Sequence, residues 1–231
     1  MSKIFALSDW HLSLYRDKPM DGFGGIWKDH PAKIEKNIRE RVSAEDYILI
    51  AGDISWAMRE EEAAADLTFI ENLPGKKILI RGNHDFWWGG VARLNEKYKT
   101  MRFLQNDAVY LRELNVAVCG TRGWLSPGDA EFEKTDGKIY RREQERLKLS
   151  LNAAMKLGAN EIIVMIHYPP TGFRDIIEAY LVSKVVYGHL HLPKKPVALG
   201  EKYFLTSADY LDFTPLLIPA YTPAAPCVSL S

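Results

Sequence analysis

Short apolar runs that end in polar loops recur along this chain, and they limit the folds that it can adopt. The runs have the length and β-branched content of buried strands, and the loops after them carry histidine, aspartate or asparagine. Segments with helical periodicity lie between the runs, and this alternation is typical of an α/β fold. The strand-like runs span 3–11, 47–55, 77–85, 161–170 and 185–191. The helical candidates span 31–42, 58–73, 91–99, 138–157 and 174–183.

Residues 102–120 depart from this alternation, because they contain three short strand-like pieces separated by few residues. We interpret them as a meander within the same domain. The chain has no internal repeat and no segment that resembles a linker. We therefore expect one domain over residues 1–231, in which about 223–231 form a flexible tail punctuated by proline.

Charge and composition narrow the range of functions. The 231 residues include 30 basic and 30 acidic ones, so no global positive field would concentrate nucleic acid or an anionic membrane. No apolar run has the length of a membrane span, and Asp9 interrupts the first run too early for a signal peptide. Cys119 and Cys227 lie far apart without zinc-finger spacing, which favours a reduced, cytoplasmic protein. We expect no membrane partner and disfavour nucleic acid as a partner.

The polar loops hold most of the histidines. Five of the six follow strand-like runs, and the remaining one, His30, is expected to be an exposed residue at a helix start. Imidazole with carboxylate and amide oxygen, without thiolates, suits divalent metals of borderline hardness, namely manganese, iron or zinc. The polar residues of these loops are Asp9, His11, Asp53, Asn83, His84, Asp85, His167, His189 and His191.

The spacing within the motifs supports one shared site. Asp9 and His11 are two residues apart, as are His189 and His191, so on extended backbone each pair points the same way. A single motif of this kind is weak evidence, because a histidine or helix cap satisfied by local hydrogen bonds explains it equally well. All five together favour a metal site. Glycines that relieve crowding where the backbone turns under a metal are Gly52, Gly82 and Gly188.

Taken in order, these motifs resemble the signature of the calcineurin-like metallophosphoesterase superfamily. The matching segments are DWH (9–11), GD (52–53), GNHD (82–85), H (167) and GHLH (188–191). The resemblance implies two mixed β-sheets packed as a sandwich, with helices on the outer faces. It implies two divalent metal ions, with Asp53 bridging them. One ion would be held by Asp9, His11, Asp53 and His191, and the other by Asp53, Asn83, His167 and His189.

The resemblance also implies a chemistry. The expected activity is hydrolysis of a small phosphodiester or phosphomonoester by a metal-activated hydroxide. His84 matches the family's non-ligand histidine, which stabilises or protonates the departing oxygen, and Asp85 is a candidate to orient it. No Asp-Arg-Gly follows Asp53, so the chain resembles bacterial-type phosphohydrolases rather than the Ser/Thr protein phosphatase branch. The alternatives are a nuclease of the same superfamily and a catalytically silent binding scaffold, although the intact ligand set argues against a scaffold.

Aromatic side chains crowd the motifs, since Trp10, Trp56, Trp87 and Trp88 lie within or directly after them. One interpretation is a rim that stacks on the organic group of a substrate, and the other is packing of these rings over the motif loops as core. The sequence leaves the oligomeric state open. Candidate contacts to a small phosphorylated substrate are Trp56, Trp88, Tyr168 and Arg122, whose planar fork suits phosphate.

Overall fold

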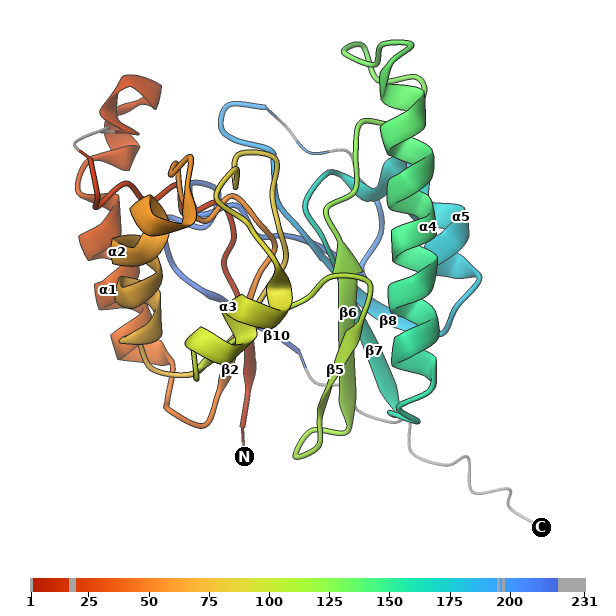
Figure 1. Cartoon of the computed structure of the whole chain (residues 1–231), viewed down its shortest axis with the longest axis horizontal. Helices are drawn as coiled ribbons and strands as arrows, with labels where there is room; N and C mark the ends of the chain where they lie inside the picture. Colours follow the sequence, from red (N-terminus) through yellow and green to blue (C-terminus); the bar gives the residue numbers. More distant parts are fainter. Residues whose placement is uncertain (1, 17–19, 195, 197, 220–231) are drawn as a thin grey trace.

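Two five-stranded β-sheets stack face to face in this structure, a computed structural model that describes residues 2–16, 20–194, 196 and 198–219 (Figure 1). Both sheets are mixed, because each has one antiparallel edge strand beside four parallel ones, and the predicted α/β sandwich is therefore confirmed. The first sheet has the order β10 (Leu216–Ile218), β1 (Ile4–Ala6), β2 (Tyr47–Ile50), β3 (Lys76–Leu79), β4 (Met101–Phe103). The second has the order β5 (Ala108–Leu111), β6 (Val116–Thr121), β7 (Glu161–Ile166), β8 (Val182–Tyr187), β9 (Tyr203–Leu205).

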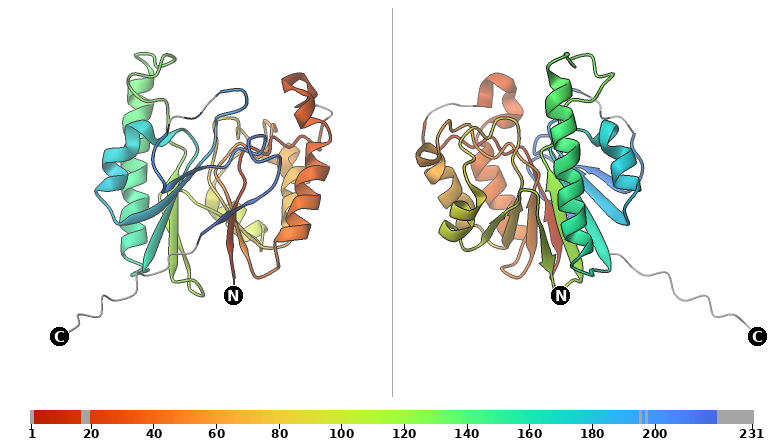
Figure 2. Two further views of the ribbon diagram at one scale, coloured as in Figure 1. Left: turned by 180° about the vertical axis from the view of Figure 1, so that it is seen from behind. Right: turned by 45° about the vertical axis from the view of Figure 1, so that its right-hand side comes forward.

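Helices cover both outer faces of the sandwich, as the views from the front and from behind show (Figures 1 and 2). The first sheet carries α1 (His30–Arg41), α2 (Glu60–Glu71) and α3 (Val91–Lys97). The second sheet carries α4 (Asp136–Met155) and α5 (Arg174–Glu178). Short 3₁₀ helices span Met20–Phe23, Gly25–Trp27 and Pro170–Phe173. No helix in the described ranges combines the length and the apolar character that a membrane crossing needs.

Alternation along the strands divides the core into three layers. In the first sheet, Ile48 and Ile50 of β2 pack toward α1 and α2, whereas Leu49 packs against the second sheet. In the second sheet, Val118 faces the first sheet and Cys119 faces α4. Because both faces of each sheet are buried, most strand residues are apolar, and this explains the apolar runs in the sequence.

The parallel strands deliver their following loops to one edge of the sandwich. β1 runs upward from the N-terminus in Figure 1, and the loops after it and after the other parallel strands gather at the upper edge. The sheets are also joined at this edge, where the hydroxyl groups of Ser8 and Thr206 lie 2.9 Å apart and Ser8 bridges to Ser207. This edge therefore holds the polar loops of both sheets close together.

Three local expectations need correction. Residues 102–120 do not form one meander, because β4 pairs with β3 in the first sheet while β5 and β6 form a hairpin in the second. The helix expected over 174–183 ends at Glu178, since β-branched Val182 already begins β8. His30 does begin α1, but it is buried, and its Nδ1 lies 3.0 Å from the carbonyl oxygen of Trp27. The tail expected at about 223–231 lies outside the described residues.

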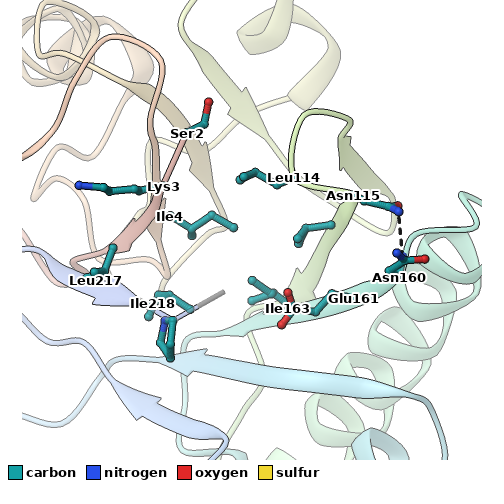
Figure 3. A pocket seen from close by; sticks show the side chains of 12 residues that line it. Ser2, Lys3, Ile4, Leu114, Asn115, Asn160, Glu161, Ile163, Leu217 and Ile218 are labelled. Carbon is teal, nitrogen blue, oxygen red and sulfur yellow. Dashed lines mark hydrogen bonds between the residues drawn. The ribbon is translucent and has the colours of Figure 1, made fainter. Parts of the chain in front are cut away.

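A cavity of about 500 Å³ lies between the sheets at the ends of β1, β6 and β7 where these strands begin (Figure 3). Ile4 and Ile218 reach into it from the first sheet, and Leu114 and Ile163 from the other side. Since the histidine-bearing loops follow the opposite ends of the strands, this apolar cavity lies far from them. It plays no part in the site described below.

Lys77 gives the fold a pH dependence that can be tested. Its ammonium group is buried and donates hydrogen bonds to the carbonyl oxygens of Leu73 and Gly75 at 2.6 and 2.9 Å. Burial lowers the pKa of Lys77 to about 8, below the ordinary value of 10.5. The charged form therefore destabilises the folded state below about pH 8, and this penalty disappears as pH rises toward 10.5.

We expect the unfolding free energy of the wild type to rise relative to Lys77→Met between pH 8 and 10.5, by on the order of 2 kcal/mol. Urea unfolding at several pH values measures this difference. Lys36→Met, which removes an exposed lysine, is the matched control and should give a flat difference. A flat difference for Lys77→Met as well would contradict the prediction.

Candidate metal centre

The backbone is unusual at the loops after the parallel strands. Asp9, His11, Asp53 and His189 all have positive φ angles, of 57°, 46°, 52° and 70°. This left-handed region is uncommon for residues other than glycine, and such strained residues cluster at functional sites because the surrounding structure must hold them there. Four of the predicted metal ligands therefore adopt a conformation that favours function over local stability.

Two glycines allow the carboxylates to approach the backbone closely. A Cβ atom at Gly82 would lie 2.1 Å from Oδ1 of Asp53, and one at Gly188 would lie 2.2 Å from Oδ2 of Asp9. No side chain fits at either position without moving the carboxylate. The backbone N–H groups of His84 and His189 then donate to Asp53 and Asp9 at 2.8 and 3.0 Å, and this fixes both carboxylates.

The first donor group combines Asp9, His11 and His191, whose ligand atoms lie within 4.8 Å of one another. Nε2 of His11 is 3.2 Å from Nε2 of His191 and 3.8 Å from Oδ2 of Asp53. Nε2 of His191 is 4.0 Å from Oδ1 of Asp9. Two imidazole nitrogens and two carboxylates thus converge, which matches the donor set of a divalent transition metal.

The second donor group lies on the other side of Asp53. Oδ2 of Asp53 is 3.5 Å from Nε2 of His167, and Oδ1 of Asn83 is 2.6 Å from the same nitrogen. Nδ1 of His189 lies 3.0 Å from Oδ1 of Asn83. Oδ2 of Asp53 therefore approaches an Nε2 nitrogen in each group. Oδ1 of Asp9 also lies within 4 Å of both groups, but on the second side it approaches Nδ1 of His167, which donates to Ala51.

Hydrogen bonds outside the donor groups orient two of the rings. Nδ1–H of His167 donates to the carbonyl oxygen of Ala51 at 2.9 Å, so the lone pair of its Nε2 faces Asn83. Two acceptor atoms at this distance are unfavourable unless a proton or a metal cation lies between them. Nδ1 of His191 lies 3.1 Å from Oδ1 of Asp209, which holds the ring with Nε2 toward Asp9 and His11. Asp209 was not predicted from the sequence as a site residue. Like the predicted ligands, it lies in a polar loop after a strand, in this case the short strand β9.

Burial controls the protonation of these groups. It raises the pKa of Asp9 well above the ordinary value and raises that of Asp53 as well. It lowers the pKa of His167 to about 3, so this imidazole is neutral and able to bind a metal. Burial also lowers the pKa of His191, but the hydrogen bond to Asp209 and the charge of Asp9 outweigh it, so that the pKa is raised. Divalent cations would favour the ionised carboxylates here, and the residues present fit such ions.

His84 and Asp85 lie in the same loop but play different parts. The His84 ring is half-buried and packs beside Trp56, with ring centroids 4.5 Å apart, and it opens into a cavity of about 140 Å³. Contrary to expectation, Asp85 makes no hydrogen bond to His84 among the described residues. Its carboxylate instead ties the loop after β2 to the loop after β3. It accepts hydrogen bonds from the backbone N–H groups of Ile54, Ser55 and Gly82 and from Nε1 of Trp87.

Some of the tryptophans pack in the core, and others lie beside the candidate metal ligands. Trp56 is half-buried, and its ring stacks on His11 with centroids 4.8 Å apart and an interplanar angle of 24°. Trp87 and Trp88 are buried and pack edge-on against Phe103 in the core, and Trp10 is buried in the same cluster. Trp27, which the sequence analysis did not select, contacts His11 edge-on at 5.8 Å and lines the same cavity as His84.

The two remaining candidates lie on the other side of the donor groups. The ring of Tyr168 lies 4.1 Å from that of His189, and burial raises the pKa of Tyr168 to about 12, so its hydroxyl remains a donor at neutral pH. Tyr168, Trp124 and His189 line a second cavity, of about 460 Å³. The guanidinium of Arg122 lies 4.4 Å above the ring of Trp124, and its backbone oxygen accepts the N–H groups of His167 and Tyr168.

The fold and the site together define an α/β sandwich protein with a candidate centre for divalent metals. The model of the calcineurin-like phosphoesterase family matches residues 2–193, and the chain belongs to this family. The resemblance noted in the sequence is thereby confirmed.

The comparison with solved structures gives similarities at low sequence identity, and the first of those described shares the fold. A protein of unknown function from Aquifex aeolicus has 16% identity and a TM-score of 0.53, with 94% of this chain and 96% of that chain covered. A putative 5′-nucleotidase from Staphylococcus aureus has 14% identity and a TM-score of 0.49, covering 96% of this chain. The sulfate thiohydrolase SoxB of Thermus thermophilus has 14% identity and a TM-score of 0.47, covering 90% of this chain. The alignment spans 54% and 51% of those last two proteins. No curated protein matches this sequence.

Proposed function

We propose that this chain is a binuclear-metal-dependent phosphoesterase that hydrolyses a small phosphodiester or phosphomonoester. The observation that carries the proposal is the position of Asp53, whose Oδ2 lies within 4 Å of nitrogens from both donor groups. Two divalent cations, when bound, supply charge neutralisation at phosphoryl oxygens and a nucleophilic water at neutral pH. Manganese, iron and zinc all suit the nitrogen and oxygen donors.

The chain's own residues position the reactants. Asp9, His11, Asp53 and His191 would hold one ion, and the second group would consist of Asp53, Asn83, His167 and His189. His84 lies beside these groups and faces a cavity, so it is placed to hold a proton at the oxygen of the leaving group. The stacking of Trp56 on His11 and beside His84 excludes water from one side of the site.

The cavities on the two sides of the donor groups favour a diester. One, of about 140 Å³, is lined by His84, His191 and Trp56, and the other, of about 460 Å³, by His189, Tyr168 and Trp124. A phosphodiester has two organic substituents, and each cavity can take one of them. The hydroxyl of Tyr168, which stays protonated, would donate to an oxygen of the substrate. A cytoplasmic location is part of the same proposal, and the buried free thiol of Cys119 is compatible with it.

The proposal predicts different roles for two tryptophans. We expect Trp56→Ala to change the ratio of kcat/KM between substrates with and without an aromatic group by roughly one to two decades, because stacking is worth about 1–3 kcal/mol. Trp88→Ala should instead lower the unfolding free energy by about 3–5 kcal/mol, since Trp88 is buried among Trp87 and Phe103, and should leave the ratios unchanged.

The assay uses manganese-loaded enzyme and a metal-free control. Substrates would be a bis-aryl phosphodiester, a panel of nucleotides and cyclic nucleotides, and phosphoserine peptides. Turnover of a diester that requires the metal supports the proposal. Phosphopeptides as best substrates would refute the substrate class, and no turnover with any substrate despite bound metal would favour a silent scaffold.

A further inference from the structure

A polar cavity of about 260 Å³ is separate from the two cavities that flank the metal ligands. It lies between the loops after β3 and β4, the end of β6 and one face of α4. Among the described residues that line it are four arginines and one carboxylate, Glu143, a formal charge of +3 from four minus one. We call it the arginine pocket, and its arginines are Arg81, Arg122, Arg142 and Arg146.

Glu143 cannot satisfy these four guanidinium groups. It is fully buried, and its Oε2 accepts the hydroxyl of Thr121 at 2.7 Å. Its Oε1 accepts Nη1 of Arg146 at 2.9 Å, while Nε of Arg142 and Nη2 of Arg122 lie 3.5 and 3.7 Å from the same oxygen. One carboxylate oxygen thus faces three guanidinium groups, which together carry more donors than it can accept.

Arg122 is an arginine of the pocket with a buried donor that is left unpaired. Its side chain is 14% exposed, and its Nε is fully buried without a hydrogen-bond partner in the described part of the chain. Burial lowers the pKa of Arg122, and the charges of Arg81 and Arg142 lower it further, although Glu143 opposes them. Nε of Arg81 donates a hydrogen bond to the backbone oxygen of Asp85 at 3.1 Å. Positive charge and unused donors therefore gather in a concave, partly buried space.

We propose that the arginine pocket binds a second anion, a phosphate or phosphoryl group, beside the metal centre. Guanidinium forks match phosphate oxygens, and several forks around one cavity suit a multiply charged anion better than a carboxylate. Two residues join the pocket to the centre: Arg81 directly precedes Gly82 and Asn83, and the backbone oxygen of Arg122 accepts the N–H groups of His167 and Tyr168. The phosphoryl group belongs either to the substrate or to a separate small anion.

A binding titration tests the pocket without using activity. Inorganic pyrophosphate is titrated into the metal-depleted full-length protein in a calorimeter, and one saturable site is expected. Arg142→Gln should weaken it about tenfold, in line with the loss of one charge-assisted hydrogen bond. Glu143→Gln should tighten it by a similar factor, because the substitution removes the competing anion but keeps the shape of the side chain.

The matched control is Arg141→Gln, which removes the same charge from the same helix, α4, but from a residue that does not line the pocket. It should leave the affinity unchanged, and thermal melts verify that each variant is folded. The absence of a saturable site would overturn the proposal. Equal losses for Arg141→Gln and Arg142→Gln would overturn it as well, because they would indicate only nonspecific charge attraction.

A second experiment distinguishes the two sources of the anion, and it rests on the proposed function. Metal-loaded wild type and Arg142→Gln are compared on a simple aryl diester and on a matched diester that carries one further phosphomonoester. If the anion is part of the substrate, Arg142→Gln raises KM about tenfold for the second diester alone. If it is a separate anion, pyrophosphate changes the turnover of the simple diester in wild type but not in Arg142→Gln. Lack of turnover would refute the proposed function, whereas the arginine pocket is decided by the titration.

Discussion

Asp53→Ala should bind far less metal than the wild type and lose activity by on the order of 10³-fold or more. The physical reason is that Oδ2 of Asp53 is the oxygen that approaches both His11 and His167, so its removal affects both donor groups at once. Metal ions contribute several kcal/mol to the stabilisation of the transition state, and each 1.36 kcal/mol is a factor of ten in rate. Metal analysis of the purified variant and kcat/KM on the best substrate measure the two effects.

The matched control is Asp46→Asn, which alters a buried carboxylate at the other end of the sandwich. Asp46 accepts hydrogen bonds from the backbone N–H groups of Lys3 and Ser43 and from the Ser43 hydroxyl. Its loss should lower stability without lowering the metal content. Two tightly bound ions per chain in Asp53→Ala would refute the bridging role, and equal metal loss in both variants would point to a general effect on folding.

His84→Ala should keep its metals and lose turnover by about 10²–10⁴-fold on a substrate with a poor leaving group, which corresponds to about 3–5 kcal/mol of barrier. The side chain makes no hydrogen bond to the donor groups in the described structure, and its ring faces the cavity beside Trp56. On an activated aryl ester the loss should be milder, because that leaving group departs without a proton. Steady-state kinetics on the two esters and metal analysis provide the measurements.

Phe86→Ala serves as the control for this experiment, because Phe86 is an exposed residue of the same loop with its ring 6.4 Å from that of His84. It should leave the ratio of the two rates near that of the wild type. Equal losses of His84→Ala on both esters would contradict a role as proton donor, and metal loss in this variant would make His84 a ligand or a support for one.

The local pattern of apolar and polar residues was sufficient to predict much of the architecture. The apolar runs became β1, β2, β3, β7 and β8, and the alternation of strand and helix gave the α/β class, because period-two burial and helical periodicity are encoded within a few residues. The family followed from motifs in order along residues 9–191, and it is confirmed by the match over 2–193. The boundaries of short elements were less certain, as the early end of α5 at Glu178 shows.

The roles of individual side chains were harder to predict. Trp56 and Trp88 occupy equivalent places beside motifs in the sequence, yet the first stacks on His11 and the second packs in the core. Asp85 was a candidate to orient His84, but its carboxylate accepts hydrogen bonds from the loop after β2. These outcomes depend on tertiary contacts between loops whose residues are far apart in the chain.

The sequence by itself determined which donors are available and that they follow strands, because residue type and local periodicity are properties of short segments. The family resemblance implied how these donors group around Asp53, and only the tertiary structure sets the distances between them. His11 contacts His191, which is 180 residues away in the sequence, and His167 contacts Asn83, which is 84 residues away. It also decided that Asp209 orients His191 and that Arg81 and Arg122 share a pocket with α4. The physical reason is that stacking of the two sheets sets distances that no local pattern encodes, and chemistry at this site depends on those distances.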